Sequence, residues 1–290
     1  VLTEAPLPVV LTLVQFATAA AFGWVMLRLM GWREYVPLPE RARPPFLRLT
    51  AVYTMGFLFV NCGYVVVNVS LAETLRSAEP LVTVMLAIFV LKTEPVSRLE
   101  LLALGPIVLG GALSSLGDSS FSLLGLLFVT ISNLSFSLRS MYTKQLRQVY
   151  NGDAFNVFFH VSTLGLVYLA ALLAMLEMVP FACSLSGGWC APPLRFFFLG
   201  NPELLLNAQV VQYFAINGLT YTLYNQTSFY VLSKVRMVTH GVANAFRRVV
   251  TILCSVWYFG NPINGTNAFG IFLAILGVVC YAKAKDLASS

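Results

Sequence analysis

The amino-acid sequence predicts an all-α polytopic membrane protein, because its composition, its apolar segments and the placement of its basic residues agree. Of the 290 residues, 58% are hydrophobic and only 10% are charged, and the mean hydropathy is +0.79. Soluble domains carry about 25% charged residues. The composition therefore argues against a soluble enzyme and against a nucleic-acid-binding protein, although the net charge is +6.

Nine apolar segments reach about 20 residues, the length at which a helix crosses the hydrocarbon core of a bilayer. The loop GWREYVPLPERARPP follows the first segment, and its prolines and charged residues end the apolar run. The chain starts with Val1 and shows no basic leader, so we expect a further segment upstream. In chain order, the predicted spans cover residues 7–30, 49–70, 72–92, 98–117, 121–143, 154–179, 203–232, 237–259 and 265–284.

The eighteen basic residues follow the alternation that these spans require. Thirteen of them fall at one set of alternating span ends, whereas only Arg195 falls in a loop on the opposite side. Excess lysine and arginine mark the loops on the positive, cytosol-like side of a membrane protein, so we expect the C-terminus on that side. The thirteen residues are Arg28, Arg33, Arg41, Arg43, Arg48, Lys92, Arg98, Lys144, Arg147, Lys234, Arg236, Lys283 and Lys285.

Two of the spans carry similar sequences that cross the membrane in opposite directions. LVTVMLAIFV (81–90) aligns with VVTILCSVWY (249–258) at an offset of 168 residues. Such a pair is typical of an inverted-topology repeat in a transporter. We therefore predict a single transmembrane transporter domain over residues 1–290, with repeat one over about 1–117 and repeat two over about 118–290. Five spans in each repeat would give ten, of which the first precedes this chain.

Four arginines lie inside predicted spans, where a charged side chain at mid-bilayer costs at least about 2.5 kcal/mol. They are Arg76, Arg139, Arg247 and Arg248. Arg139 is the nearest of them to a span end, from which a long side chain can reach the interface. Glu73 and Glu79 each lie three residues from Arg76, so a purely structural ion pair is an alternative for that arginine.

The charge inside the spans is positive, because four arginines against two glutamates leave an excess of +2. A buried excess of charge is costly unless a counter-ion is present. Phosphate groups are largely dianionic at pH 7, since their second pKa is about 6, and the arginine fork matches phosphate oxygens. In the empty carrier, the positive charges of the site would repel one another and keep its two halves apart, whereas a bound dianion would let the halves close and the carrier change sides. This predicts strict exchange of one anion for another.

Polar residues recur every three or four positions in three spans. The third span carries Glu73, Arg76, Pro80 and Thr83, the seventh carries Tyr213, Asn217, Tyr221, Tyr224 and Ser228, and the eighth carries His240, Asn244, Arg247, Thr251 and Ser255. On a helix, this spacing places the side chains on one face, which indicates a water-accessible path. The alternative is that the three stripes hold neighbouring helices together by hydrogen bonds.

Two segments resemble a known family. LYNQTSFYVLSKVRMVTHGVANAFRRVV (223–250) resembles a segment that reads YNQ…VTHSVGN…KRVV in the plastid phosphate translocators, the triose-phosphate translocator family of the drug/metabolite transporter superfamily. AETLRSAEPLVTV (72–84) resembles THTIKALEPFFSV of the same family. The resemblance covers essentially the whole chain. It implies a ten-helix antiporter of two five-helix inverted repeats that exchanges phosphate for phosphorylated three-, five- or six-carbon compounds.

Carried over by position, the resemblance also implies a set of substrate-binding residues. The family's phosphate-binding Lys-Arg pair falls on Arg247 and Arg248, and its earlier lysine falls on Arg76. Its substrate-contacting tyrosine falls on Tyr224. Together with the polar residues of the spans, the candidate site comprises Arg247, Arg248, Arg76, Tyr224, Asn244, Arg139, Glu73, Phe57 and Tyr221.

The chain departs from the family's pattern in three ways. A site histidine of the triose-phosphate members is Phe57 here, which narrows or dries that wall, and the histidine of THT is Glu73, which weakens the positive field near Arg76. Arginine also replaces lysine at Arg76 and Arg247. These changes argue against triose phosphate itself, and AET resembles endomembrane relatives of the family. A nucleotide-sugar antiporter of the Golgi or endoplasmic reticulum is therefore the alternative to a plastid-envelope carrier.

We expect a transporter that needs no cofactor or metal, and not an enzyme, because no span or loop presents paired catalytic residues. The expected partners are inorganic phosphate, a small phosphorylated metabolite and membrane lipid, but no nucleic acid. Cys183 and Cys190 flank one loop, CSLSGGWC. They either form a disulfide in an oxidising lumen or remain two free thiols.

Overall fold

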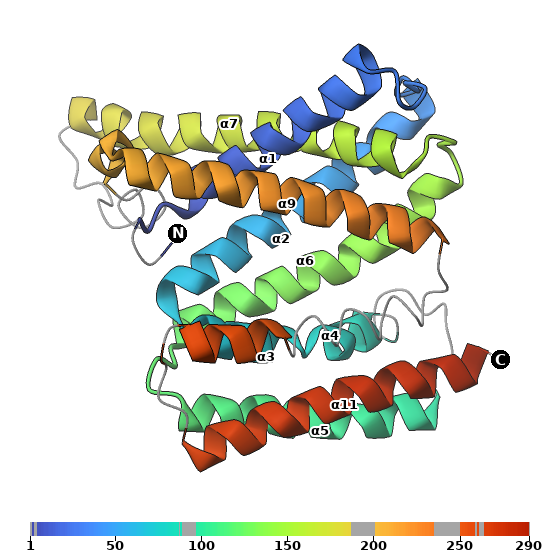
Figure 1. The fold of residues 1–290 in the computed structure, drawn as a ribbon, viewed down its shortest axis with the longest axis vertical. Helices are drawn as coiled ribbons and strands as arrows, with labels where there is room; N and C mark the ends of the chain where they lie inside the picture. The colour runs from blue at the N-terminus through green and yellow to red at the C-terminus, as the bar shows by residue number, and fades with distance from the viewer. Residues whose placement is uncertain are drawn as a thin grey trace. The chain divides into compact units, whose positions relative to one another are not determined.

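The computed structural model describes residues 2, 5–86, 88, 97–186, 201–234, 250–258, 260 and 264–289. Within these ranges the chain forms nine α-helices with defined ends and no β-strand, which confirms the predicted all-α class (Figure 1). The helices are α1 (Pro8–Trp24), α2 (Arg43–Val66), α3 (Val69–Arg76), α4 (Glu79–Leu86), α5 (Arg98–Gly117), α6 (Leu123–Arg147), α7 (Ala154–Ser186), α9 (Ala208–Lys234) and α11 (Gly265–Ser289).

Six helical segments of the described chain are long and apolar enough to cross a membrane, as a polytopic membrane protein requires. They agree with the first, second, fourth, fifth, sixth and ninth predicted spans. α9 has the length of these six segments but not their hydropathy. Of the eighth predicted span, the structure describes only residues 250–258, which are helical. The six segments are Pro8–Leu29, Glu40–Val66, Arg98–Leu116, Leu123–Arg147, Ala154–Leu176 and Gly265–Ala284.

The third predicted span is not one continuous helix. It is divided into α3 and α4, with Ser77 and Ala78 between them. Pro80 explains the break, because proline has no N–H for the preceding turn and its ring clashes with the carbonyl four residues earlier. Asn133 of α6 donates a hydrogen bond from Nδ2 to the carbonyl oxygen of Leu75, at 3.1 Å. A backbone acceptor near the break is thereby satisfied without water.

The chain divides into two compact units, which we describe separately. The first unit contains Val1–Val65 and Arg139–Ser233, and the second contains Val66–Leu138 and Lys234–Ser290. This division is based on compactness and does not test the two repeats predicted at 1–117 and 118–290.

Buried amide side chains join three helices of the first unit. Gln15 of α1 donates from Nε2 to Oδ1 of Asn217 on α9, at 2.8 Å. Asn61 of α2 donates from Nδ2 to Thr12 Oγ1 at 2.9 Å and to Gln15 Oε1 at 3.2 Å. Interhelical hydrogen bonds of this kind hold helices together where lipid offers no polar partner. Asn217, one of the regularly spaced polar residues on α9, therefore serves helix packing.

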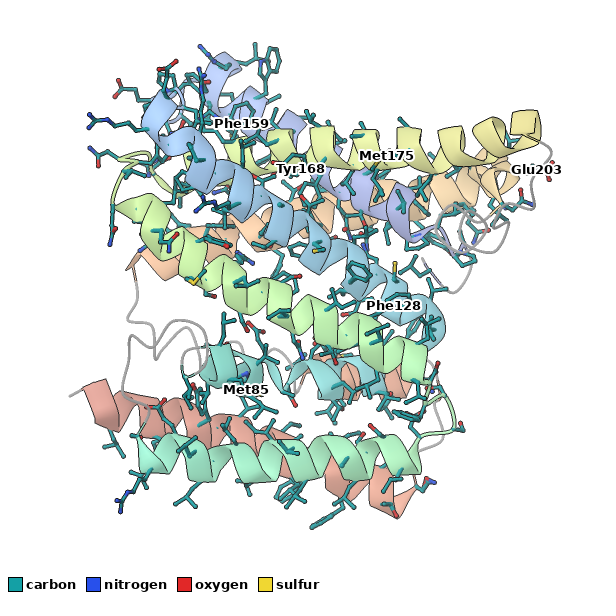
Figure 2. The ribbon with its side chains drawn as sticks, turned by 180° about the vertical axis from the view of Figure 1, so that it is seen from behind. Met85, Phe128, Phe159, Tyr168, Met175 and Glu203 are labelled. Carbon is teal, nitrogen blue, oxygen red and sulfur yellow. The ribbon has the colours of Figure 1, made fainter. Side chains whose placement is uncertain are left out.

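The first unit also packs α7 closely against α1 and α2. Phe159 of α7 lies against Gly23 of α1, where a Cβ atom would be 2.8 Å from the phenyl ring (Figure 2). Tyr168, further along α7, donates its hydroxyl to the carbonyl oxygen of Leu47 at 3.3 Å. Tyr150 precedes α7 and donates to the carbonyl oxygen of Val36 at 2.9 Å. Burial raises the pKa of the Tyr150 phenol above its usual range, so this donor stays protonated at neutral pH.

In the second unit, α5 and α11 lie side by side along most of their lengths (Figure 1). Two glycines allow this close approach. A Cβ atom on Gly110 would lie 2.3 Å from the backbone nitrogen of Ala274, and one on Gly270 would lie 2.3 Å from the backbone nitrogen of Ser114. At one end of the pair, Ser114 donates to Asn267, whose amide donates to Asp118 at 3.3 Å. Helices α5 and α11 are thus held together by close backbone contact and by hydrogen bonds between polar side chains.

Replacing Gly110 with alanine is expected to separate α5 from α11. The new methyl group would meet backbone and not a movable side chain, and overpacking of this kind costs about 1–3 kcal/mol. We predict a lower midpoint of thermal unfolding for Gly110→Ala, measured on the purified protein in lipid nanodiscs. Gly111→Ala is the matched control, because a Cβ atom there meets nothing within 4 Å. Equal midpoints for the two variants would contradict the close packing.

Candidate functional site

The structure describes six of the nine predicted site residues. Phe57, Arg139, Tyr221 and Tyr224 belong to the first unit. Glu73 and Arg76 belong to the second unit. Arg247, Arg248 and Asn244 lie outside the described residues, as do Cys190 and the side chain of Cys183. The two described groups differ in how their arginines are neutralised.

Arg139 of α6 is held by two aromatic rings. Its Cζ atom lies over the ring of Tyr53 on α2, at 4.6 Å from the centroid, and over the ring of Phe229 on α9, at 4.8 Å. A guanidinium over an aromatic face gains about 0.5–2 kcal/mol, with more where water is excluded. Tyr53 and Phe229 are both buried. The three helices therefore fix the guanidinium through ring faces.

Arg139 makes no ion pair within the part of the chain that the structure describes. The salt bridges recorded there join Arg33 to Asp153, Arg43 to Glu40 and Arg76 to Glu73. Its guanidinium also makes no hydrogen bond to a described residue, because ring faces accept no conventional hydrogen bond from the edge of the fork. No described residue therefore uses the positive charge or the N–H donors of the Arg139 guanidinium.

A chain of buried hydroxyl and amide groups holds Tyr53 in place. Its hydroxyl donates to Oδ1 of Asn225 at 3.1 Å, and the hydroxyl of Tyr221 donates to the Tyr53 oxygen at 3.3 Å. Asn225 in turn donates from Nδ2 to the carbonyl oxygen of Tyr221, at 2.9 Å. The Asn225 amide therefore accepts a hydrogen bond through Oδ1 and donates one through Nδ2. This network orients the ring over which Arg139 lies.

Phe57 and Tyr221 are brought together, but as packing partners. The Phe57 ring lies 4.9 Å from the ring of Tyr53 and 4.9 Å from the ring of Tyr221, between centroids. Phe16 of α1 completes the cluster, at 5.9 Å from Tyr221. Aromatic rings thus surround Phe57, and its effect on a substrate-binding wall stays a prediction. Tyr224 is 40% exposed, whereas Tyr221 is buried, so only Tyr224 presents its ring away from the core.

Arg76 shows the opposite arrangement to Arg139. Its Nη1 atom donates to Oε1 of Glu73 at 2.5 Å, and both residues are buried. The guanidinium lies over the ring of Phe136 on α6, with Cζ 5.5 Å from the centroid. Arg76 is the last residue of α3, where the helix dipole favours a positive charge. The ion pair that the sequence offered as an alternative is therefore formed.

Sequence reasoning missed three residues that shape the surroundings of Arg139. Tyr53 and Phe229 were overlooked because an aromatic residue in a span is equally consistent with packing or contact with lipid. Asn225 lies four residues after Tyr221, a spacing that places both on one helix face, so a signal for it was present. Among the described residues, no group of three or more His, Cys, Asp or Glu side chains could hold a metal ion.

Comparison with known proteins identifies a family to which this chain is similar. A family model described as the Triose-phosphate Transporter family matches residues 1–282. Phosphoenolpyruvate/phosphate translocator 3 of Oryza sativa subsp. japonica is 33% identical over 97% of this chain and 68% of its own length. Phosphoenolpyruvate/phosphate translocator 1 of Arabidopsis thaliana is 30% identical over 97% of this chain and 65% of its length.

A third relative, the xylulose 5-phosphate/phosphate translocator of Arabidopsis thaliana, is 30% identical over 94% of this chain and 62% of its own length. All three relatives are named as chloroplast proteins. The chain thus spans about two thirds of the length of the relatives that it matches. Their names share inorganic phosphate as one of two transported compounds.

Two substitutions at Tyr53 separate its hydroxyl from its ring. Tyr53→Phe keeps the ring over Arg139 but leaves Asn225 Oδ1 without its donor, which costs about 1–2 kcal/mol. Tyr53→Leu also removes the ring and is expected to destabilise the protein more. Thermal unfolding in nanodiscs would measure both variants. Tyr213→Phe is the control, because the Tyr213 hydroxyl accepts a hydrogen bond from the exposed Gln209; a Tyr53→Phe midpoint equal to this control would refute the buried network.

Proposed function

The chain belongs to the Triose-phosphate Transporter family, and we propose that it is an antiporter that exchanges inorganic phosphate for a phosphorylated compound. The relatives named above support this proposal, because each is named for phosphate and for a phosphorylated partner compound. The chloroplast relatives favour a plastid envelope as its membrane.

The observation that carries this proposal is that no carboxylate among the described residues pairs with the guanidinium of Arg139. An arginine inside a membrane bundle persists only where it is paired or lines a functional path. Arg139 is offset by the faces of Tyr53 and Phe229 and by no carboxylate of the described chain. A protein that kept this residue for packing alone would gain more from an apolar side chain. An anionic substrate supplies the missing partner.

We further propose that the remaining candidate residues take part in binding. Arg76, Arg247 and Arg248 would bind anionic groups through their guanidinium forks, which match phosphate oxygens bidentately. Tyr224 and Asn244 would donate hydrogen bonds, and the apolar wall formed by Phe57 and Tyr221 would limit the size of the compound. The ten-helix inverted repeat, working by alternating access, is the architecture that we propose. The break between α3 and α4 supports it, because transporters bind substrates beside interrupted helices.

The decisive test is uptake of labelled phosphate into proteoliposomes that contain the purified chain. The vesicles would be preloaded with phosphoenolpyruvate, triose phosphate, a pentose phosphate, a hexose phosphate or a nucleotide sugar with its monophosphate. We expect phosphate uptake that depends on a phosphorylated three-carbon or sugar compound inside the vesicle. Exchange of a nucleotide sugar without any phosphate uptake would instead show that the alternative predicted from the sequence holds.

Arg139 variants test the role of the open guanidinium in the same assay. Arg139→Gln removes the charge, so we expect an apparent KM for the phosphorylated compound that is raised about tenfold or more. Arg139→Lys keeps the charge but loses the planar fork of the guanidinium. Its KM should lie between that of the wild type and that of Arg139→Gln. Arg41→Gln serves as the control, because Arg41 is exposed and lies in the short 3₁₀ helix Glu40–Ala42 that precedes α2. A normal KM in Arg139→Gln would exclude Arg139 from the binding site.

A further inference from the structure

The ion pair between Glu73 and Arg76 lies in an unusual position for a structural salt bridge. Both residues belong to α3 and are three positions apart, so the pair joins no two helices. The Glu73 side chain is 1% exposed and the Arg76 side chain is 10% exposed. A buried ion pair contributes little net stability compared with apolar residues of the same volume. The ion pair between the two side chains therefore does not itself hold two helices together.

We infer that Glu73 is a built-in counter-ion that occupies Arg76 in the absence of substrate and that the anionic group of the substrate displaces. The inference rests on the proposed function, in which Arg76 binds an anion. The Nη1–Oε1 distance of 2.5 Å is that of a charge-assisted hydrogen bond. A phosphate oxygen needs the same N–H groups. Carboxylate and substrate are thus competitors for one guanidinium.

The position of Arg76 fits such an exchange of partners. Arg76 ends α3 directly before the break at Ser77 and Ala78. The neighbouring helix α6 contacts this region through one face, where Asn133 binds the carbonyl of Leu75 and Phe136 lies beside the guanidinium. Ser137, next on that face, is 2.8 Å from Thr83 of α4. Asn133 and Phe136 thus contact this end of α3, and the exchange of partners that we propose moves the Glu73 carboxylate away from the guanidinium.

The competition has two consequences for transport. First, Glu73 lowers the affinity for phosphate, because the displaced carboxylate remains near the bound anion and repels it. Second, the Glu73–Arg76 pair is neutral as a whole, so Arg76 does not by itself prevent the empty carrier from changing sides. Glu73 therefore shifts the carrier from strict exchange toward net flow, in contrast to the strict exchange expected from a bare arginine.

Glu73→Gln tests both consequences in proteoliposomes that are preloaded with the best counter-substrate. We expect the apparent KM for phosphate to fall about five- to tenfold, and uptake into vesicles without counter-substrate to fall relative to preloaded vesicles. Glu100→Gln is the matched control, since Glu100 is also a buried carboxylate of the second unit but lies in the first turn of α5. Its KM should stay within about twofold of the wild-type value.

A second variant covers the case in which Glu73→Gln does not fold. Glu73→Ala leaves room for a free carboxylate, so the protein would be purified in acetate and assayed with and without it. We expect acetate to raise the KM for phosphate in Glu73→Ala and to leave that of the wild type unchanged, as a soluble replacement for the lost counter-ion should.

The outcomes separate this inference from the proposed function. Wild-type exchange of phosphate together with an unchanged or raised KM in Glu73→Gln, or an acetate-insensitive Glu73→Ala, would overturn the inference alone. Absence of phosphate exchange in the wild type under every preload would overturn the proposed function and the inference with it. A lowered KM in Glu73→Gln with an unchanged Glu100→Gln supports both.

Discussion

A positive charge enclosed by apolar helices has to be offset by something inside the protein, and this constraint organises the described part of the chain. A guanidinium that is cut off from water and left without a partner costs several kcal/mol. Arg76 meets the constraint with the carboxylate of Glu73, whereas Arg139 meets it with the faces of Tyr53 and Phe229. The first solution cancels the charge, but the second only shields it.

The same constraint acts on uncharged polar groups and on the backbone. Where the third span is interrupted, Asn133 reaches from α6 to the carbonyl oxygen of Leu75, which also accepts from the backbone N–H of Ala78. Gln15, Asn61 and Asn217 use their amides on one another across three helices. Asn225 accepts from Tyr53 and donates to Tyr221, which fixes the ring beneath Arg139. Interhelical polar contacts thus serve two ends, because they hold helices together and also orient a side chain that is available to a ligand.

The sequence was sufficient for the fold class and for most spans, because hydropathy and charge placement are local properties of the chain. α5 begins and ends at the predicted residues, 98 and 117. The break at Ser77 was missed although Pro80 was visible, because the apolar pattern continues through it. The pairing of Arg76 with Glu73 was foreseen as an alternative from their spacing. The rings around Arg139 could not be predicted, since they come from α2 and α9, and only the tertiary fold brings these helices to α6.

The difference between the two arginines bears on how a carrier can bind dianions and still exist empty. Such a protein needs positive charge that a substrate can use, yet each unused charge raises the free energy of the empty state. In the function that we propose, the faces of Tyr53 and Phe229 shield Arg139 but leave its N–H groups to an anion. Glu73 neutralises Arg76 until the anionic group of the substrate displaces the carboxylate. The affinity for the anion and the ability of the empty carrier to reorient then depend on how many arginines are covered by aromatic rings and how many are paired with a carboxylate. A single acidic residue can therefore change the balance between exchange and net flow.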